Sequence, residues 1–120
     1  MTRRALATAA GCQLVAQCDL AVAANEARFG VNGIDVGLFC ATPGVALSRN
    51  LLPKQAMEML LTGEFISADE ARARGLVNRV VAADELDAEV ERLLVRLLDK
   101  PKEALAMGKT LFYRQLETGM

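Results

Sequence analysis

The three prolines of this chain, Pro43, Pro53 and Pro101, limit where its helices can begin and end. Proline fits the first turn of an α-helix, whereas inside a helix it removes a hydrogen bond and clashes with the preceding turn. Thr42 before Pro43 predicts a capped helix start, and Pro53 predicts a second start, whose helix stops at Gly63. The chain is therefore expected to form several short helices rather than one long one.

Short apolar segments alternate with these helices. Residues 20–24 and 27–30 predict two short strands, and the β-branched run at 76–81 predicts a third. Ser67 and Glu70 have the spacing of a capping box, in which the hydroxyl and the carboxylate each satisfy an unpaired amide at a helix start. Together these patterns predict a mixed α/β chain.

The clearest amphipathic pattern follows Asp84. Its apolar positions share one helical face, whose predicted role is packing, and Glu89 falls on the other, polar faces. The members of this stripe are Leu86, Val90, Leu93, Leu94 and Leu97. A last helix after Pro101 is expected to carry Leu105, Met107, Leu111, Phe112 and Leu116.

Length and composition indicate one folded domain. The chain has 120 residues, of which 52% are hydrophobic and 24% are charged, unlike a disordered chain. Its 14 basic residues nearly balance its 15 acidic residues, so charge gives no argument for nucleic acid or an anionic membrane as a partner. No stretch approaches the roughly 18 apolar residues of a membrane span. We expect a soluble, unprocessed chain.

Histidine is absent, which excludes Ser/His and Cys/His nucleophile pairs and every metal site that needs an imidazole. The three cysteines, Cys12, Cys18 and Cys40, are an odd number without a Cys-x-x-Cys pair. They match neither a disulfide scaffold nor a zinc cluster, so we expect no metal and a reducing compartment. Carboxylates, amines, thiols and backbone dipoles are the groups left for chemistry.

A turn of small residues, Ala9-Ala10-Gly11-Cys12, precedes a helix-like segment. Amides at a helix start lack partners within the helix and can bind an anion or a developing oxyanion. Physical reasoning alone favours the simpler interpretation, in which the small residues only allow close packing. For Cys12, a packed small hydrophobe is likewise preferred over a reactive thiolate. The glycine-rich segment 30–37 is the likeliest irregular loop.

The order of motifs resembles the crotonase family, also called enoyl-CoA hydratases/isomerases. The resemblance covers nearly the whole chain, and no single motif carries it. The motifs are Ala7-Thr8-Ala9-Ala10-Gly11-Cys12-Gln13-Leu14, Cys18-Asp19-Leu20-Ala21-Val22-Ala23, Ala27-Arg28-Phe29-Gly30, Val36-Gly37-Leu38, Thr42-Pro43-Gly44, Met57-Glu58-Met59-Leu60-Leu61-Thr62-Gly63, Ile66-Ser67-Ala68-Asp69-Glu70-Ala71 and Gly75-Leu76-Val77-Asn78-Arg79-Val80-Val81.

The resemblance implies an α/β fold of the ββα-spiral type, with residues 1–120 as a partial domain that lacks the first spiral turns and the final helices. It implies binding of acyl-CoA thioesters, no cofactor apart from the coenzyme A of the substrate, and assembly as homo-trimers or hexamers. Two backbone amides of the family polarise the thioester carbonyl, and Ala10 matches one of them. The other amide matches no residue of this chain.

The resemblance also assigns the candidate site residues. Family hydratases carry glutamates at the positions that match Gln13 and Gly33, and neither residue here can take up a proton near neutral pH. Asp35 is the nearest carboxylate to Gly33 and could substitute, although loop aspartates usually bind local amides or water. The expected catalytic residues are Ala10, Gln13 and Asp35, and the expected substrate-binding residues are Ala9, Gly11, Gly33 and Gly37.

Two functions remain open at this point. The first is an enoyl-CoA hydratase-like lyase or isomerase of fatty-acid metabolism that works without the usual glutamate pair. The second is a catalytically silent acyl-CoA-binding or oligomer-forming paralogue. Restoring both carboxylates, by Gln13→Glu with Gly33→Glu, is expected to raise the hydration rate. The expected location is the cytoplasm of a bacterium or the mitochondrial matrix of a eukaryote.

Overall fold

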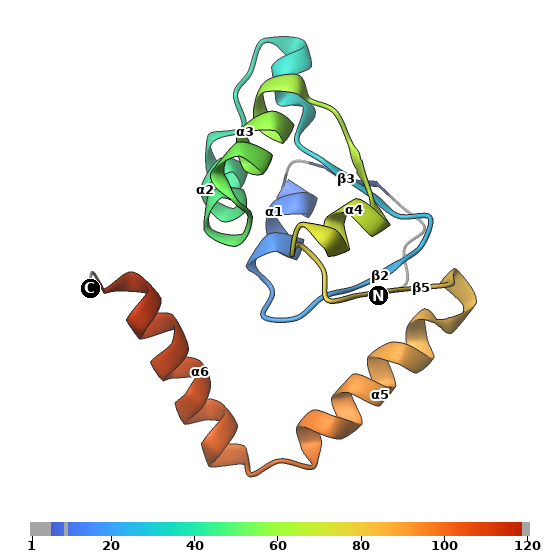
Figure 1. The fold of residues 1–120 in the computed structure, drawn as a ribbon, viewed down its shortest axis with the longest axis vertical. Helices are drawn as coiled ribbons and strands as arrows, with labels where there is room; N and C mark the ends of the chain where they lie inside the picture. Colours follow the sequence, from blue (N-terminus) through green and yellow to red (C-terminus); the bar gives the residue numbers. More distant parts are fainter. Residues whose placement is uncertain (1–5, 9, 119–120) are drawn as a thin grey trace. The chain divides into compact units, whose positions relative to one another are not determined.

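The computed structural model describes residues 6–8 and 10–118 of the chain. It divides into two compact units, Met1–Asp87 and Ala88–Met120, which we describe separately (Figure 1). The N-terminal unit holds all of the described strands and most of the helices. Its elements are β1 (Leu6–Thr8), α1 (Ala10–Gln17), β2 (Val22–Ala24), β3 (Arg28–Gly30), η1 (Asn32–Val36), α2 (Ala41–Asn50), α3 (Pro53–Thr62), β4 (Ile66–Ser67), α4 (Ala68–Ala73), β5 (Arg79–Val81) and η2 (Ala83–Glu85), where η marks a 3₁₀-helix.

Two small sheets lie in this unit. In the first, the strand order is β1-β3-β4, with β1 parallel to β3 and β3 antiparallel to β4. In the second, β2 pairs with β5 in parallel. Parallel strands cannot be joined by a tight turn, so each parallel pair requires an intervening crossover segment. In the first sheet this segment includes α1, which is the next element after β1 in the chain.

Several predicted helix boundaries are confirmed. Pro53 is the first residue of α3, and Gly63 ends this helix in the left-handed conformation, with φ of 68°. Ser67 and Glu70 form the predicted capping box, in which the Glu70 N–H donates to Ser67 Oγ at 3.1 Å and the Ser67 N–H donates to Glu70 Oε1 at 3.2 Å. These boundaries depend on local geometry, which explains why the sequence predicted them.

Other boundaries differ from the prediction. The cap of α2 is Cys40 rather than Thr42, and the helix begins at Ala41. Segment 30–37 was expected to be irregular, yet it contains η1 over Asn32–Val36. The third predicted strand is shorter than expected, because β5 starts at Arg79, where its pairing with β2 begins.

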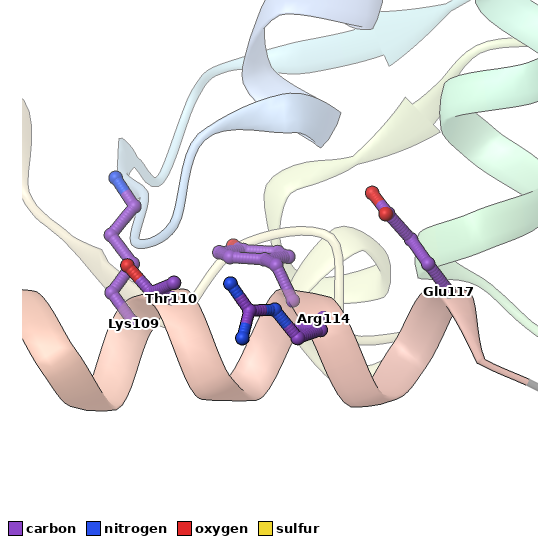
Figure 2. A pocket seen from close by; sticks show the side chains of 5 residues that line it. Lys109, Thr110, Arg114 and Glu117 are labelled. Carbon is purple, nitrogen blue, oxygen red and sulfur yellow. The ribbon is translucent and has the colours of Figure 1, made fainter.

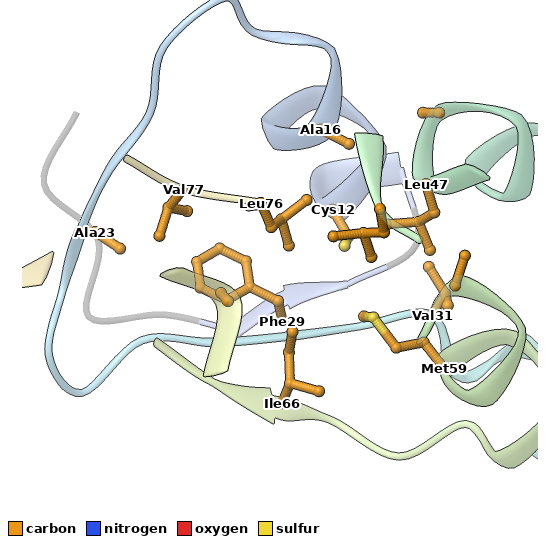
Figure 3. Packing of buried hydrophobic residues seen from close by; sticks show 14 of the residues in the cluster. Cys12, Ala16, Ala23, Phe29, Val31, Leu47, Met59, Ile66, Leu76 and Val77 are labelled. Atoms are coloured by element: carbon orange, nitrogen blue, oxygen red, sulfur yellow. The ribbon is translucent and has the colours of Figure 1, made fainter. Parts of the chain in front are cut away.

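The core of the N-terminal unit lies between the three-stranded sheet and the helices. Figure 3 shows Phe29 and Ile66 of the sheet close to Leu76, while Cys12, Leu47, Val31 and Met59 gather beside them. Each large apolar side chain buried in this way stabilises the fold by about 1.5–3 kcal/mol. The core therefore fixes α1 against β3 and against α2.

The C-terminal unit holds most of α5 (Leu86–Leu98) and all of α6 (Lys102–Glu117). The predicted stripe of α5 is only partly buried, since Leu94 is 50% exposed. Glu89 was predicted on a polar face but is buried, and Arg92 Nε donates to its Oε2 at 3.0 Å. The paired guanidinium compensates the buried carboxylate. Every residue of α6 is exposed, and no helix in the described ranges is long and apolar enough to cross a membrane.

Candidate site at the carboxyl edge of β1 and β3

The candidate site lies where two parallel strands end. In the β1–β3 pair, Thr8 is opposite Gly30, and these are the last residues of their strands. The chain continues from β1 into α1 and from β3 into η1, so both segments start at the same edge of the sheet. Ligands of parallel sheets bind at the carboxyl ends of strands. The pairing thus brings the predicted oxyanion turn and the predicted glycine loop to one edge.

Ala10 is the first residue of α1. The first four N–H groups of an α-helix have no partner within that helix, and the helix dipole makes this end partly positive. The position therefore suits the role predicted for the Ala10 amide, which remains a prediction. Ala9, predicted to bind substrate, lies outside the described residues.

Cys12 follows in the first turn of α1 and points into the core (Figure 3). Its side chain is 0% exposed. Burial raises the pKa of the Cys12 thiol to about 11, more than a hydrogen bond with the Gly30 backbone lowers it. The thiol is therefore protonated at neutral pH, as expected for a packed small hydrophobe.

Gln13 and Gly33, which the resemblance predicts to match the family's glutamates, are both partly buried. Gln13 lies in the first half of α1, and Gly33 lies in η1. A Cβ atom built on Gly33 would be 2.8 Å from Cys40 Sγ and 3.0 Å from the Leu38 carbonyl oxygen. The position has no room for a side chain unless its neighbours move, which sequence reasoning did not reveal.

Asp35 lies in η1 with Gly33, but its carboxylate is close to a different helix. Its Oδ1 would be 2.8 Å from a Cβ atom on Gly63, the residue that ends α3. The side chain is exposed. The structure thus places the carboxylate beside the end of α3, and a catalytic role for Asp35 remains a prediction.

The remaining two glycines have different surroundings. Gly11 is exposed in the first turn of α1, with open space where a side chain would stand. Gly37 ends η1 in the left-handed conformation, with φ of 82°, and its N–H donates to the Ile34 carbonyl at 3.1 Å. Gly37 therefore has a structural role in closing the loop, and its predicted role in substrate binding remains a prediction.

A hollow lies in the C-terminal unit alone. It has a volume of about 370 Å³ and is lined by residues of α6, namely Lys109, Thr110, Tyr113, Arg114 and Glu117 (Figure 2). None of these residues belongs to the predicted site. The described ranges contain no group of three or more Cys, Asp or Glu residues that could hold a metal ion.

Comparison with known proteins supports the resemblance seen in the motifs. The enoyl-CoA hydratase/isomerase family model matches residues 4–120. The chain belongs to this family. It is 52% identical over 111 residues to the mitochondrial enoyl-CoA hydratase domain-containing protein 3 of Xenopus laevis, and 50% identical to that of Homo sapiens. These matches cover 92% of the chain and 38% and 37% of the respective relatives.

A relative with a named reaction and two solved structures extend this comparison. Crotonyl-CoA hydratase of Syntrophomonas wolfei is 37% identical, covering 90% of the chain and 42% of that protein. An enoyl-CoA hydratase of Mycobacterium smegmatis superposes with a TM-score of 0.94 at 65% identity, covering 97% of the chain and 45% of that structure. Human enoyl-CoA hydratase domain-containing protein 3 gives 0.91 at 50% identity, covering 96% and 46%.

These comparisons confirm the predicted family and the crotonase-type α/β fold with C-terminal helices. The chain spans less than half the length of these relatives. We therefore propose, rather than assign, the activity, substrates and assembly of the whole protein.

Proposed function

We propose that this chain forms part of an acyl-CoA-binding site of the enoyl-CoA hydratase/isomerase type, in which the Ala10 N–H stabilises an enolate of the thioester. The observation that carries the proposal is the parallel pairing of β1 with β3, which starts α1 and the Gly33 loop at one sheet edge. An amide aimed at a developing oxyanion stabilises the transition state more than the ground state. In the proposed reactions, fatty-acid thioesters are the substrate class.

The proposed site has few side chains that can donate or accept a proton. Gln13 can hold a water molecule or a substrate oxygen but cannot accept its proton, and Gly33 offers no side chain. The raised pKa of Cys12 keeps this neighbouring thiol protonated at neutral pH. We therefore propose that the amide provides the main catalytic effect and that any water addition is slow, with Asp35 as the remaining candidate base.

The same observations favour a second candidate function. A site that polarises a thioester carbonyl but lacks both carboxylates can bind acyl-CoA without converting it. Such a protein would be a silent acyl-CoA-binding paralogue. This alternative is supported by the absent side chain at Gly33 and by the lack of space for one.

One experiment separates the two functions. The purified protein is mixed with crotonyl-CoA, and loss of the conjugated enoyl absorbance is followed against a control without protein. In parallel, calorimetry measures binding of butyryl-CoA, which has no double bond to hydrate. Turnover well above the control would support the lyase and exclude the silent paralogue. Binding of butyryl-CoA without turnover of crotonyl-CoA would support the paralogue, and absence of both binding and turnover would refute both functions.

We also propose that the protein forms homo-oligomers through α6. This helix carries the large apolar residues Leu111, Phe112 and Leu116, which are 56%, 56% and 60% exposed. Large exposed apolar patches mark interaction surfaces in soluble proteins. Sedimentation analysis should give a mass of several chains, and Phe112→Lys with Leu116→Lys should reduce it. A monomeric mass for the unmodified protein would refute this proposal.

The named relatives also suggest a cellular location for this protein. The domain-containing protein 3 relatives are named as mitochondrial proteins. For this chain we propose the mitochondrial matrix if the source is eukaryotic and the cytoplasm if it is bacterial. Fractionation of the source cells followed by immunoblotting would test the assignment.

A further inference from the structure

Cys40 occupies a helix start without using its side chain to cap the helix. It is the N-cap residue of α2, and its carbonyl oxygen accepts from the Gly44 N–H at 2.8 Å, but its side chain makes no capping hydrogen bond. Serine, threonine, asparagine and aspartate are preferred here because their oxygens accept from the first turn. A thiol is a weak acceptor. The thiol therefore takes no part in capping α2.

The Cys40 thiol instead lies over Gly33. A Cβ atom on Gly33 would be 2.8 Å from the sulfur, well below the roughly 3.5–4.0 Å of ordinary contact between nonbonded heavy atoms. Cysteine has one side-chain torsion, so the sulfur can leave only by changing to another staggered rotamer. The thiol thus fills the space that a side chain at position 33 would need.

The backbone at this loop limits the space further. The Leu38 carbonyl oxygen would be 3.0 Å from the same Cβ atom, and the Leu38 N–H donates to the Gly33 carbonyl at 2.9 Å. Cys40 itself is partly buried and packs against the core cluster that contains Cys12. The sulfur is therefore held by its surroundings rather than free in solvent.

We propose that the Cys40 thiol and Gly33 form a matched pair beside the proposed site: the thiol occupies the place of a residue-33 side chain, so a carboxylate introduced at position 33 can act only when the thiol is removed. This inference rests on the proposed function, and deepens it by naming the residue that stands in the way of a carboxylate introduced at position 33. The consequence differs from the expectation drawn from the sequence alone: Gln13→Glu with Gly33→Glu leaves hydration slow while the thiol remains. Removing the thiol as well removes the closest contact that a residue-33 side chain would meet, and leaves the Leu38 carbonyl oxygen at 3.0 Å as the next one.

The test compares three variants of the protein. The double variant carries Gln13→Glu and Gly33→Glu, the triple variant adds Cys40→Ala, and a matched control adds Cys18→Ala instead. Cys18 is an exposed cysteine that follows the end of α1. The triple variant should hydrate crotonyl-CoA about a hundredfold faster than the double variant, as expected when a general acid-base group is positioned correctly. It should also have the higher Tm, while the control behaves like the double variant.

The results against the inference are equally defined. Equal hydration rates for the double and triple variants, with both folded, would overturn it. Butyryl-CoA binding by calorimetry distinguishes this failure from failure of the proposed function. If the unmodified protein and the variants bind butyryl-CoA without the predicted rate difference, only the Cys40 inference falls. If none of them binds, the proposed function falls, and the inference falls with it.

A gentler pair of substitutions covers the case in which the glutamate variants do not fold. Gly33→Ala adds only the Cβ atom, which would lie 2.8 Å from Cys40 Sγ and 3.0 Å from the Leu38 carbonyl oxygen. It should lower Tm in the unmodified chain and lower it less in a Cys40→Ala background, because the closest contact is then gone. The same fall in both backgrounds would show that the sulfur does not fill this space, and would overturn the inference.

Discussion

The substitution Ala10→Pro removes the one amide on which the proposed chemistry depends while leaving a helix start. Ala10 is the first residue of α1. Proline is well tolerated there, because the lost N–H has no partner within the helix and the fixed φ suits helical geometry. The same substitution inside a helix would cost about 3 kcal/mol. The stability of the variant is therefore itself a test of where α1 begins.

The expected functional effect differs between binding and reaction. Loss of one hydrogen bond to a neutral carbonyl costs about 0.5–1.5 kcal/mol, which weakens the binding of butyryl-CoA by roughly two- to twelvefold. Loss of an oxyanion donor lowers turnover by about 10²–10³-fold, because the bond strengthens as charge develops on the oxygen. Any turnover should thus fall much more than affinity.

The assay uses three readouts. Calorimetry gives the Kd of butyryl-CoA, the carbonyl ¹³C shift of the bound labelled thioester reports polarisation, and enoyl absorbance reports turnover. Lys102→Pro is the matched control, since Lys102 is the exposed first residue of α6. An Ala10→Pro variant that keeps its Tm, its carbonyl shift and its turnover would refute the role of this amide.

The remaining predictions concern stability and reactivity. Gly63→Ala should destabilise the chain by about 1–2 kcal/mol in urea unfolding, because position 63 is left-handed; an unchanged midpoint would contradict this. Iodoacetamide at pH 7.5 should alkylate Cys18 and spare Cys12, since burial raises the pKa of the Cys12 thiol to about 11; equal labelling of the folded chain by mass spectrometry would argue against it. Ser67→Ala should lower the free energy of unfolding by about 1 kcal/mol, because α4 loses its N-terminal cap. Hydrogen bonds from the Ser67 backbone and side chain lower the pKa of Glu70 below its ordinary value of 4.5. The stability that the Glu70 carboxylate contributes is therefore present above pH 4.5 and is lost as the pH falls through the lowered pKa. Unfolding of Glu70→Gln and the unmodified chain should therefore differ more at pH 7 than in acid, and a constant difference would refute the linkage.

Packing explains where sequence reasoning failed. Glu89 was predicted on a polar face, yet it is buried beside Arg92, because the periodicity of a helix does not reveal which neighbours will cover it. The strand β1 was not predicted, since a three-residue strand is defined by its partner rather than by its own composition. Cys40 was overlooked because nothing in its local sequence indicates that its thiol covers Gly33.

The sequence by itself determined the local features of this protein. Pro53 and Gly63 bound α3, and Ser67 with Glu70 caps α4, because each depends on the conformational preferences or hydrogen bonds of residues close in the chain. The order of motifs likewise identified the family, which the family model confirms.

Tertiary structure decided which residues come together at the candidate site. The pairing of Thr8 with Gly30 joins segments far apart in sequence, and the sulfur of Cys40 reaches Gly33 only after the loop between them has folded. Such contacts arise from packing in three dimensions, which no local pattern specifies.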